Sequence, residues 1–385
     1  MPGFGNIVQA QLYQPVKTEN KLPVAVERWE EMAREKLEDG PYWYIAGGAG
    51  AGETMQANLE AFQRWHIQPR MFCDVENRDL SATILNETLP YPLLLAPIGV
   101  QSIAHPDAEI ASAKAAASMN VPFITSSASS RSMEEIADAM GNKPRWFQLY
   151  WSKDDDVTAS MLKRAEQAGY SAIVVTLDTT MLSWREADLE NAYLPFLQGV
   201  GIANYITDPA FRSKLKKMPE EDMSGAIQYF LRIFSNAGLT WKDLAFIRKH
   251  TNLPIILKGI LHPKDAELAI EHGVDGIIVS NHGGRQVGGA ISALDALENI
   301  SEATKDRILL LMDSGIRRGS DILKALALGA KAVLLGRPYI YGLAVAGEKG
   351  VKQVIRNLLA DFDLTMALSG IRSISEIDRS LLVKR

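Results

Sequence analysis

A repeated pair of patterns constrains the fold of this 385-residue chain more than any other feature. Each pair is a short apolar run followed by a segment with apolar residues at helical spacing, as in buried parallel strands joined by crossover helices. The apolar runs span 92–100, 121–127, 146–151, 172–178, 254–260, 276–283, 308–315 and 332–338. Helical patterns between them include 107–119, 156–168, 263–272 and 320–329.

Eight near-uniform units of this kind favour a closed α/β barrel of the TIM (β/α)8 type. The alternative is an open, doubly wound sheet, which would not need eight similar units. Such sheets usually carry a glycine-rich dinucleotide loop after an early strand, and that fingerprint is absent from this sequence. We therefore predict a (β/α)8 barrel.

Two segments interrupt the repeat. Residues 1–90 form an N-terminal extension that we expect to pack on the catalytic barrel of residues 91–385, with a helix near 24–37. Residues 189–240 form a long insertion after the fourth strand and precede a crossover helix at 241–249. A loop of this length in a compact domain is usually functional or mobile, and its mixed composition indicates an active-site lid rather than a membrane anchor.

Composition excludes several classes of protein. The net charge of -5 comes without a long basic run, so we expect no nucleic-acid partner. A single cysteine, Cys73, excludes an intrachain disulfide framework and a cysteine-rich metal site, and we expect no bound metal. No apolar stretch approaches the roughly 18 residues of a membrane span, and Met1–Gly5 does not resemble the start of a secretory signal. These features predict a cytoplasmic protein without a membrane partner.

Polar and small residues follow the predicted strands, where barrel enzymes place their chemistry. Each one alone has an ordinary explanation as a turn residue or helix cap, but their convergence on one face predicts an active site. They are Ala96, Pro97, Ser126, Gln148, Tyr150, Thr176, Asp178, Lys258, Ser280, His282, Asp313, Gly336 and Arg337.

The last two units combine small residues with arginines. The segments 313–319 and 335–338 include Gly315, Arg317 and Arg337. Barrels commonly form a phosphate site here from backbone N–H groups and a helix N-terminus. A pair of tight turns would explain the glycines alone, but the arginines favour a phosphate from a substrate or a cofactor.

Three further side chains indicate the reaction. Lys258 follows an apolar strand, where it can form a Schiff base or stabilise a reduced flavin. His282 and Arg285 lie three residues apart in a glycine-rich turn, which suits a substrate with both an exchangeable proton and a carboxylate. A flavin-free lyase or aldolase that uses Lys258 remains an alternative at this point.

The sequence resembles the FMN-dependent 2-hydroxy acid oxidising family, which includes glycolate oxidase, lactate oxidase, lactate monooxygenase and mandelate dehydrogenase. The shared motifs run through nearly the whole chain in family order. They are YWYIAGGAG, LLLAPIGVQ, AHPDAE, ITSSAS, FQLYW, VTLDT, WREAD, LKGI, SNHGGRQ, DSGIRRG and LLGRP.

The resemblance implies FMN as the cofactor and a homotetramer as the assembly. It places Lys258 beside the flavin atoms that gain negative charge on reduction, which disfavours the Schiff base. The cofactor-binding residues that it implies are Ala96, Pro97, Ile98, Ser126, Gln148, Thr176, Lys258, Ser280, Asp313, Gly315, Arg317, Gly336 and Arg337.

For the substrate, the resemblance implies a carboxylate site and a catalytic base. His282 is the base, Asp178 orients it, and Tyr150 lies near the substrate hydroxyl. The residues that bind substrate are Tyr42, Tyr150, Arg185 and Arg285.

Two departures from the glycolate oxidase pattern resemble the lactate monooxygenase branch: Ile98-Gly99 replaces a Thr-Ala pair, and the loop after Asp188 is longer. We therefore expect oxidation of L-lactate, or a similar small L-2-hydroxy acid, by O2 to acetate, CO2 and water. The alternative is an oxidase that releases pyruvate and hydrogen peroxide. A dehydrogenase that uses a quinone or cytochrome fits less well, because the sequence carries no haem-binding domain.

Overall fold

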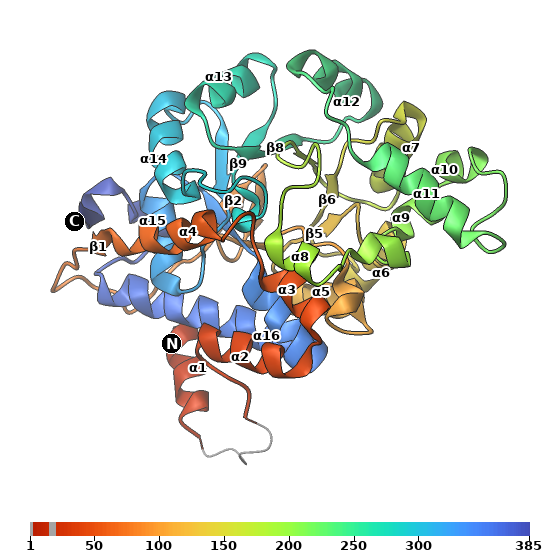
Figure 1. Cartoon of the computed structure of the whole chain (residues 1–385). Coiled ribbons are helices and arrows are strands. Elements are labelled where there is room, and N and C mark those ends of the chain that lie inside the picture. Colours follow the sequence, from red (N-terminus) through yellow and green to blue (C-terminus); the bar gives the residue numbers. More distant parts are fainter. Residues whose placement is uncertain (1–2, 15–20) are drawn as a thin grey trace.

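A computed structural model describes residues 3–14 and 21–385, and its centre is a closed barrel of eight parallel strands (Figure 1). The predicted (β/α)8 architecture is therefore confirmed. The strands follow the order β10-β11-β4-β5-β6-β7-β8-β9 around the barrel. Their bounds are β4 Leu93–Leu95, β5 Phe123–Ser126, β6 Arg145–Leu149, β7 Ile173–Thr176, β8 Ile255–Ile260, β9 Gly276–Val279, β10 Leu309–Met312 and β11 Ala332–Leu335.

Most strands end before the apolar runs that predicted them. Strand β4 ends at Leu95 because Pro97 has no N–H to continue the ladder and Val100 adopts a left-handed φ of 51°. Strand β9 ends at Val279, and His282 has a φ of 58°. The residues beyond each strand therefore form turns, and these turns carry many of the predicted site residues. Other predicted residues lie within the strands themselves, and they are Ser126, Gln148, Thr176 and Lys258.

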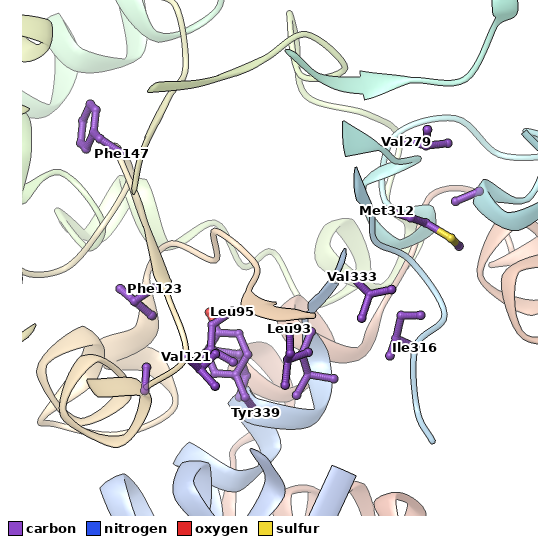
Figure 2. Close-up of a cluster of buried hydrophobic side chains, with 14 of the residues drawn as sticks. Leu93, Leu95, Val121, Phe123, Phe147, Val279, Met312, Ile316, Val333 and Tyr339 are labelled. Carbon is purple, nitrogen blue, oxygen red and sulfur yellow. The ribbon is translucent and has the colours of Figure 1, made fainter. Parts of the chain in front are cut away.

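Strand residues alternate between two hydrophobic layers, as the period of two requires. Leu94, Ile124 and Ile278 belong to the cluster inside the barrel. Leu93, Leu95 and their equivalents belong to the larger cluster between strands and helices. Figure 2 shows part of this outer layer, where Leu93 and Leu95 lie near Tyr339 of the C-terminal helix.

The crossover helices surround the barrel, and capping explains several of their starts. Ser132 forms a capping box with Glu135, and Asp154 accepts hydrogen bonds from the amides of Asp156 and Val157. The helices are α5 Ala108–Ser118, α6 Met133–Met140, α7 Asp155–Gln167, α12 Leu244–His250, α13 Pro263–Glu271, α14 Ala293–Thr304, α15 Gly319–Ala327 and α16 Arg337–Leu368, which has a kink at Ala346-Gly347.

The N-terminal segment adds helices α1 Phe4–Leu12, α2 Val26–Lys36, α3 Asp39–Ala46 and α4 Glu53–Gln63. Its hairpin of β2 Ala82–Ile84 and β3 Glu87–Leu89 contributes Ala82, Ile84 and Leu89 to the inner cluster. Strand β1 Trp65–Ile67 pairs with the C-terminal strand β12 Leu382–Lys384. The division into a 1–90 extension and a 91–385 barrel domain stays a prediction, and residues 1, 2 and 15–20 of that extension lie outside the described residues.

The segment between β7 and β8 is largely helical rather than an extended loop. It contains α8 Glu186–Glu190, η3 Pro195–Gln198, α9 Ala203–Ile206, α10 Pro209–Ser213, α11 Met223–Phe234 and η4 Trp241–Asp243. We call residues 186–234 the insert. Tyr205, Phe211 and Phe230 of the insert are fully buried. The insert therefore has its own hydrophobic core, which packs beside the barrel near α6 and α7 (Figure 1).

Buried polar contacts attach the insert to the barrel. The side chain of Asn204 accepts a 2.7 Å hydrogen bond from the amide of Met133 and donates to Ser129 Oγ. Asp208, which is fully buried, pairs with Arg164 at 3.0 Å. Removing either partner would leave an unsatisfied buried polar group, so these contacts fix the position of the insert. Within residues 3–14 and 21–385, no helix is both long and apolar enough for a membrane span.

Candidate active site

A cavity of about 1170 Å³, part of it open to solvent, lies at the turns that follow the barrel strands. Many predicted site residues line it: Ala96, Pro97, Ile98, Tyr150, Arg185, Lys258, His282, Arg285, Asp313, Gly315, Arg317, Gly336 and Arg337. We call the polar side chains at the strand ends the cavity floor. Phe196 and Phe234 of the insert, together with Leu182, also line the cavity and form what we call the cavity roof.

His282 and Asp178 are within hydrogen-bond distance of each other at the floor. His282 Nδ1 lies 2.8 Å from Asp178 Oδ1 and 3.3 Å from Thr179 Oγ1. Burial lowers the pKa of His282 and outweighs the opposing effect of Asp178, so the imidazole is neutral at neutral pH. A neutral ring whose Nδ1–H faces Asp178 leaves Nε2 free to accept a proton, which is the state that a general base requires.

Asp178 is held as an anion beside this histidine. Burial alone would raise the pKa of Asp178. The positive charge that His282 gains on protonation, its hydrogen bond and the more distant charge of Lys258 outweigh burial, so the pKa of Asp178 lies below its usual value. Oδ1 also accepts a hydrogen bond from Thr179, and Oδ2 is buried without a partner among the described residues. This carboxylate can therefore stabilise an imidazolium when His282 gains a proton.

The backbone at Gly259 makes room for Asp178. Gly259 has a φ of 105°, and a Cβ there would lie 2.8 Å from both Cβ and Cγ of Asp178. Side chains rarely adopt this φ, and the contact is closer than real Cβ atoms tolerate. The glycine of the LKGI motif is therefore required by the position of the carboxylate.

Two guanidinium groups lie together on the same side of the cavity. Arg285 Nη1 donates to the carbonyls of Tyr44 and Gly47, and within the described residues Nε and Nη2 remain for a ligand. Arg185 Nε donates to the carbonyl of Arg285 at 3.0 Å. Desolvation and the nearby charge of Arg185 lower the pKa of Arg285 to about 9, and it stays cationic at neutral pH. Two close positive charges favour an anionic ligand such as a carboxylate.

The structure does not bring Tyr42 to this cavity, contrary to the prediction. Its ring lies under the guanidinium of Arg34, 4.8 Å from that group, and packs against Trp43. Tyr44 lines the cavity instead, with Arg285 4.9 Å above its ring. Both tyrosines belong to α3, where residues two apart point in nearly opposite directions. The motif YWYIAGGAG identified the segment, but not which tyrosine faces inward.

Lys258 is almost completely buried at the floor. Its ammonium lies 3.0 Å from Asp313 Oδ2 and donates a 2.8 Å hydrogen bond to Ser280 Oγ. Ser280 Oγ also accepts from the amide of His282. A buried lysine needs such partners, and these contacts fix its ammonium at the cavity surface. The arrangement stabilises negative charge that develops next to it.

Ser126, Gln148 and Thr176 lie behind the cavity surface rather than at it. Ser126 Oγ donates to Gln148 Oε1 at 3.0 Å, and Gln148 Nε2 donates to Thr176 Oγ1 at 2.9 Å. All three side chains are buried. They form one hydrogen-bonded row across the ends of β5, β6 and β7, which orients the neighbouring turns.

The predicted phosphate segments converge on the N-terminus of α16. Each nitrogen of the Arg337 guanidinium donates to a backbone carbonyl, of Ile45, Gly283 and Gly47. Arg317 makes a single side-chain bond of this kind, from Nη1 to its neighbour Ile316. Arg337 therefore supplies mainly charge, whereas Arg317 retains donors for a phosphate beside the first turn of a long helix.

These residues fit FMN. Lys258, Arg317, Arg337 and the two substrate-side arginines line one cavity, whereas Asp313 is the carboxylate that lines it and already pairs with Lys258. This excess of positive charge suits a ligand with a phosphate and a ring system that gains negative charge. Burial lowers the pKa of Arg337 to about 10, the nearby positive charge of Arg317 contributes in the same direction, and a bound anion would offset both effects.

The cavity residues that were not predicted include Tyr44, Thr179, Phe196 and Phe234. Tyr44 and Thr179 are adjacent to motifs that were identified, so a closer reading of YWYIAGGAG and VTLDT could have found them. Phe196 and Phe234 come from separate parts of the insert and reach the cavity through tertiary packing. No local pattern marks them.

Comparison with known proteins agrees with this site. The family model of the FMN-dependent dehydrogenases matches residues 33–384. The chain is 44% identical to an L-lactate oxidase of Lysinibacillus sphaericus, over 97% of this chain and 96% of that protein. It is 42% identical to glycolate oxidase of Spinacia oleracea, over 92% and 94% of the two chains.

A solved structure shows the same fold. The crystal structure of a mandelate oxidase superposes with a TM-score of 0.83 at 36% identity and covers 94% of this chain and 99% of that one. The matched region includes the whole barrel and every strand-end residue described above. The chain therefore belongs to the FMN-dependent dehydrogenase family and is an oxidoreductase whose cofactor is FMN.

Proposed function

We propose that this protein oxidises L-lactate, or a similarly small L-2-hydroxy acid, with O2 and gives acetate, CO2 and water. The observation that carries the proposal is the His282–Asp178 pair, 2.8 Å apart, on the same cavity as Arg285 and Lys258. A 2-hydroxy acid needs a base for its proton, a cation for its carboxylate and an electron acceptor. This cavity supplies the first two beside the place that suits FMN.

The substrate carboxylate binds to the free nitrogens of Arg285, with Arg185 adding positive charge. Tyr44 lies beside Arg285 and takes the place that the resemblance gave to Tyr42. Burial raises the pKa of the Tyr150 phenol well above its usual value, so Tyr150 stays protonated and can donate to the substrate hydroxyl or carboxylate.

His282 Nε2 removes a proton from the substrate, and Asp178 stabilises the imidazolium that results. FMN, when bound, supplies the two-electron acceptor for this oxidation. Lys258, which is held by Asp313 and Ser280, provides positive charge beside that acceptor. The same base serves whether the electrons leave as a hydride or after formation of a carbanion.

The roof supports the monooxygenase outcome. Oxidation of lactate by O2 gives pyruvate and hydrogen peroxide, and these two combine to acetate, CO2 and water if they stay together. Phe196 and Phe234 are largely buried over the cavity and belong to an insert attached to the barrel. A roof that is fixed over the cavity in this way restricts the exit, which slows the release of pyruvate and favours the second step.

An oxidase that releases pyruvate and hydrogen peroxide is the second candidate, and the 44% identity to an L-lactate oxidase favours it. An aerobic assay with L-lactate separates the two. We expect acetate and CO2 in proportion to the O2 consumed, with little peroxide. Equal amounts of pyruvate and peroxide would contradict the monooxygenase proposal and support the oxidase. The homotetramer that the resemblance implied and the cytoplasmic location that the sequence predicted both stay predictions.

A further inference from the structure

The cavity has a polar side and an apolar side. His282, Arg285 and Arg185 lie on the polar side, whereas Phe196, Phe234 and Leu182 form the roof. The reacting carbon of a 2-hydroxy acid carries a carboxylate, a hydroxyl, a hydrogen and one further substituent. The polar residues and FMN account for the first three groups. The remaining substituent is apolar in lactate, and it faces the roof.

Phe234 of the roof contacts Tyr150 of the floor. Its ring centroid lies 5.2 Å from that of Tyr150 at an interplanar angle of 62°. It also lies 5.2 Å from the ring of Phe196. Tyr150 is the residue beside the substrate hydroxyl in the proposed function, so the Phe234 ring borders the space next to the reacting carbon.

The Phe234 ring cannot move away without disrupting buried packing. It lies 4.8 Å from the ring of Phe230, which is itself 4.7 Å from Tyr205, and both of these partners are fully buried. The adjacent carbonyl of Ile233 accepts a 2.8 Å hydrogen bond from the amide of Lys153. The end of α11 is therefore attached to the turn after β6, and the ring is held in place.

We infer that Phe234 is the specificity-determining residue of this cavity, which restricts the substituent of the 2-hydroxy acid to about the size of a methyl group. The inference rests on the proposed function and refines its substrate class. A rigid wall excludes longer substituents because neither the ring nor the helix behind it can yield. Loss of part of the ring opens space in the direction of the substituent.

The test uses the FMN-loaded enzyme with L-lactate, L-2-hydroxybutyrate and L-2-hydroxy-4-methylpentanoate. The rate of flavin reduction without O2 is measured for the wild type, Phe234→Leu and Phe234→Met. We expect both variants to raise the ratio of the rate constant for the longest acid to that for lactate by about 10-fold or more. Phe234→Met places an unbranched, flexible side chain of similar volume to Leu, which can adapt to the surrounding rings, and it serves if Phe234→Leu folds poorly.

Phe211→Leu is the matched control. Phe211 belongs to the same buried core of the insert and is fully buried, but it does not line the cavity, and its aromatic partners are Tyr205 and Tyr229 rather than Phe234. We expect its selectivity ratio to stay near that of the wild type. An equal rise in Phe211→Leu would overturn the inference, because general loosening of the insert would then explain the change. An unchanged ratio in both Phe234 variants would overturn it as well.

Failure of the proposed function gives a different result. If none of the three acids reduces the flavin of the wild type, both the proposed function and the inference are overturned. If lactate reduces the wild-type flavin and the Phe234 variants keep its selectivity, the inference alone fails. Melting temperature and the visible flavin spectrum show that each variant is folded and loaded.

Discussion

The floor and the roof of the cavity differ in how they are made. The floor consists of charged and hydroxyl side chains at the ends of neighbouring strands, each fixed by a short hydrogen bond such as that from Lys258 to Ser280. The roof consists mainly of two rings from the insert, Phe196 and Phe234, whose centroids lie 5.2 Å apart. Parallel strands bring the floor together by topology, whereas the roof depends on packing between distant segments.

This difference indicates which property of the enzyme the floor and the roof each control. Floor groups hold charge and protons at fixed positions, so changes there affect the chemical step. Roof groups limit space, so changes there affect which substituent fits. Variants of the floor should therefore lower the rate with every acid alike, whereas variants of Phe234 should alter the ratio between acids.

The largest effect is expected for His282→Ala. Loss of the base should lower the rate of flavin reduction about 10³-fold with every 2-hydroxy acid, since general base catalysis contributes on the order of 10² to 10⁴. FMN should remain bound, because Lys258 and Arg317 are intact. Anaerobic stopped-flow absorbance measures both the rate of flavin reduction and the amount of bound FMN. A His282→Ala enzyme that turns over at the wild-type rate would refute the assignment of the base.

The second-largest effect is expected for Glu109, a buried residue whose side chain binds two of the turns next to the cavity floor. Its Oε1 accepts hydrogen bonds from the amides of Gln101 and Ser130, in the turns after β4 and β5. Burial raises its pKa from 4.5 to about 7. The folded state thus binds the Glu109 proton more tightly than the unfolded chain does. Binding of this proton adds its full contribution to the free energy of unfolding below about pH 4.5, and the contribution is lost as the pH rises toward about 7.

Glu109→Gln keeps an acceptor oxygen for both amides but does not titrate. We expect the free energy of unfolding of the wild type to fall by up to about 3 kcal/mol, relative to the variant, between about pH 4.5 and about pH 7. Urea unfolding at both ends of this range measures the difference. Parallel pH profiles for the two proteins would show that Glu109 does not titrate there.

The third effect tests the anion site of the floor. Arg285→Lys keeps the charge but loses the planar fork of donors, so kcat/KM should fall about 10²-fold. Most of this loss should appear in KM for every acid, without a change in the selectivity ratio. Steady-state kinetics with lactate and a longer acid make this comparison. A shift in selectivity would contradict the separation of floor and roof.

The smallest effect is expected for Gly259→Ala. The new Cβ would lie 2.8 Å from Asp178 and displace its carboxylate from His282, which should lower kcat about 10-fold. Gly273→Ala is the matched control, because Gly273 also has a left-handed φ, of 67°, but no atom within 4 Å of the added Cβ. Equal losses of kcat in the two variants would indicate general strain rather than displacement of Asp178.

The sequence predicted the floor better than the roof for physical reasons. Strand-end residues such as Lys258 and Asp313 follow apolar runs, and barrel topology then brings them together. The two tyrosines of α3 could not be distinguished, because the rotation of that helix depends on the packing of Tyr42 against Arg34.

The roof carried no such signal. Phe196 and Phe234 are 38 positions apart in the insert and meet only when α11 and η3 pack together. The insertion was predicted as a lid, but the sequence did not show that Tyr205 and Phe230 give it a buried core of its own. Long-range aromatic packing of this kind has no fixed spacing along the chain.

The visible spectrum of the purified enzyme, recorded before and after L-lactate is added without O2, tests the central claim most directly. We predict the yellow absorption of bound FMN in the first spectrum and its rapid loss in the second, with return of the colour when air is admitted. A colourless protein, or a flavin spectrum that L-lactate and the other small 2-hydroxy acids leave unchanged, would contradict the account.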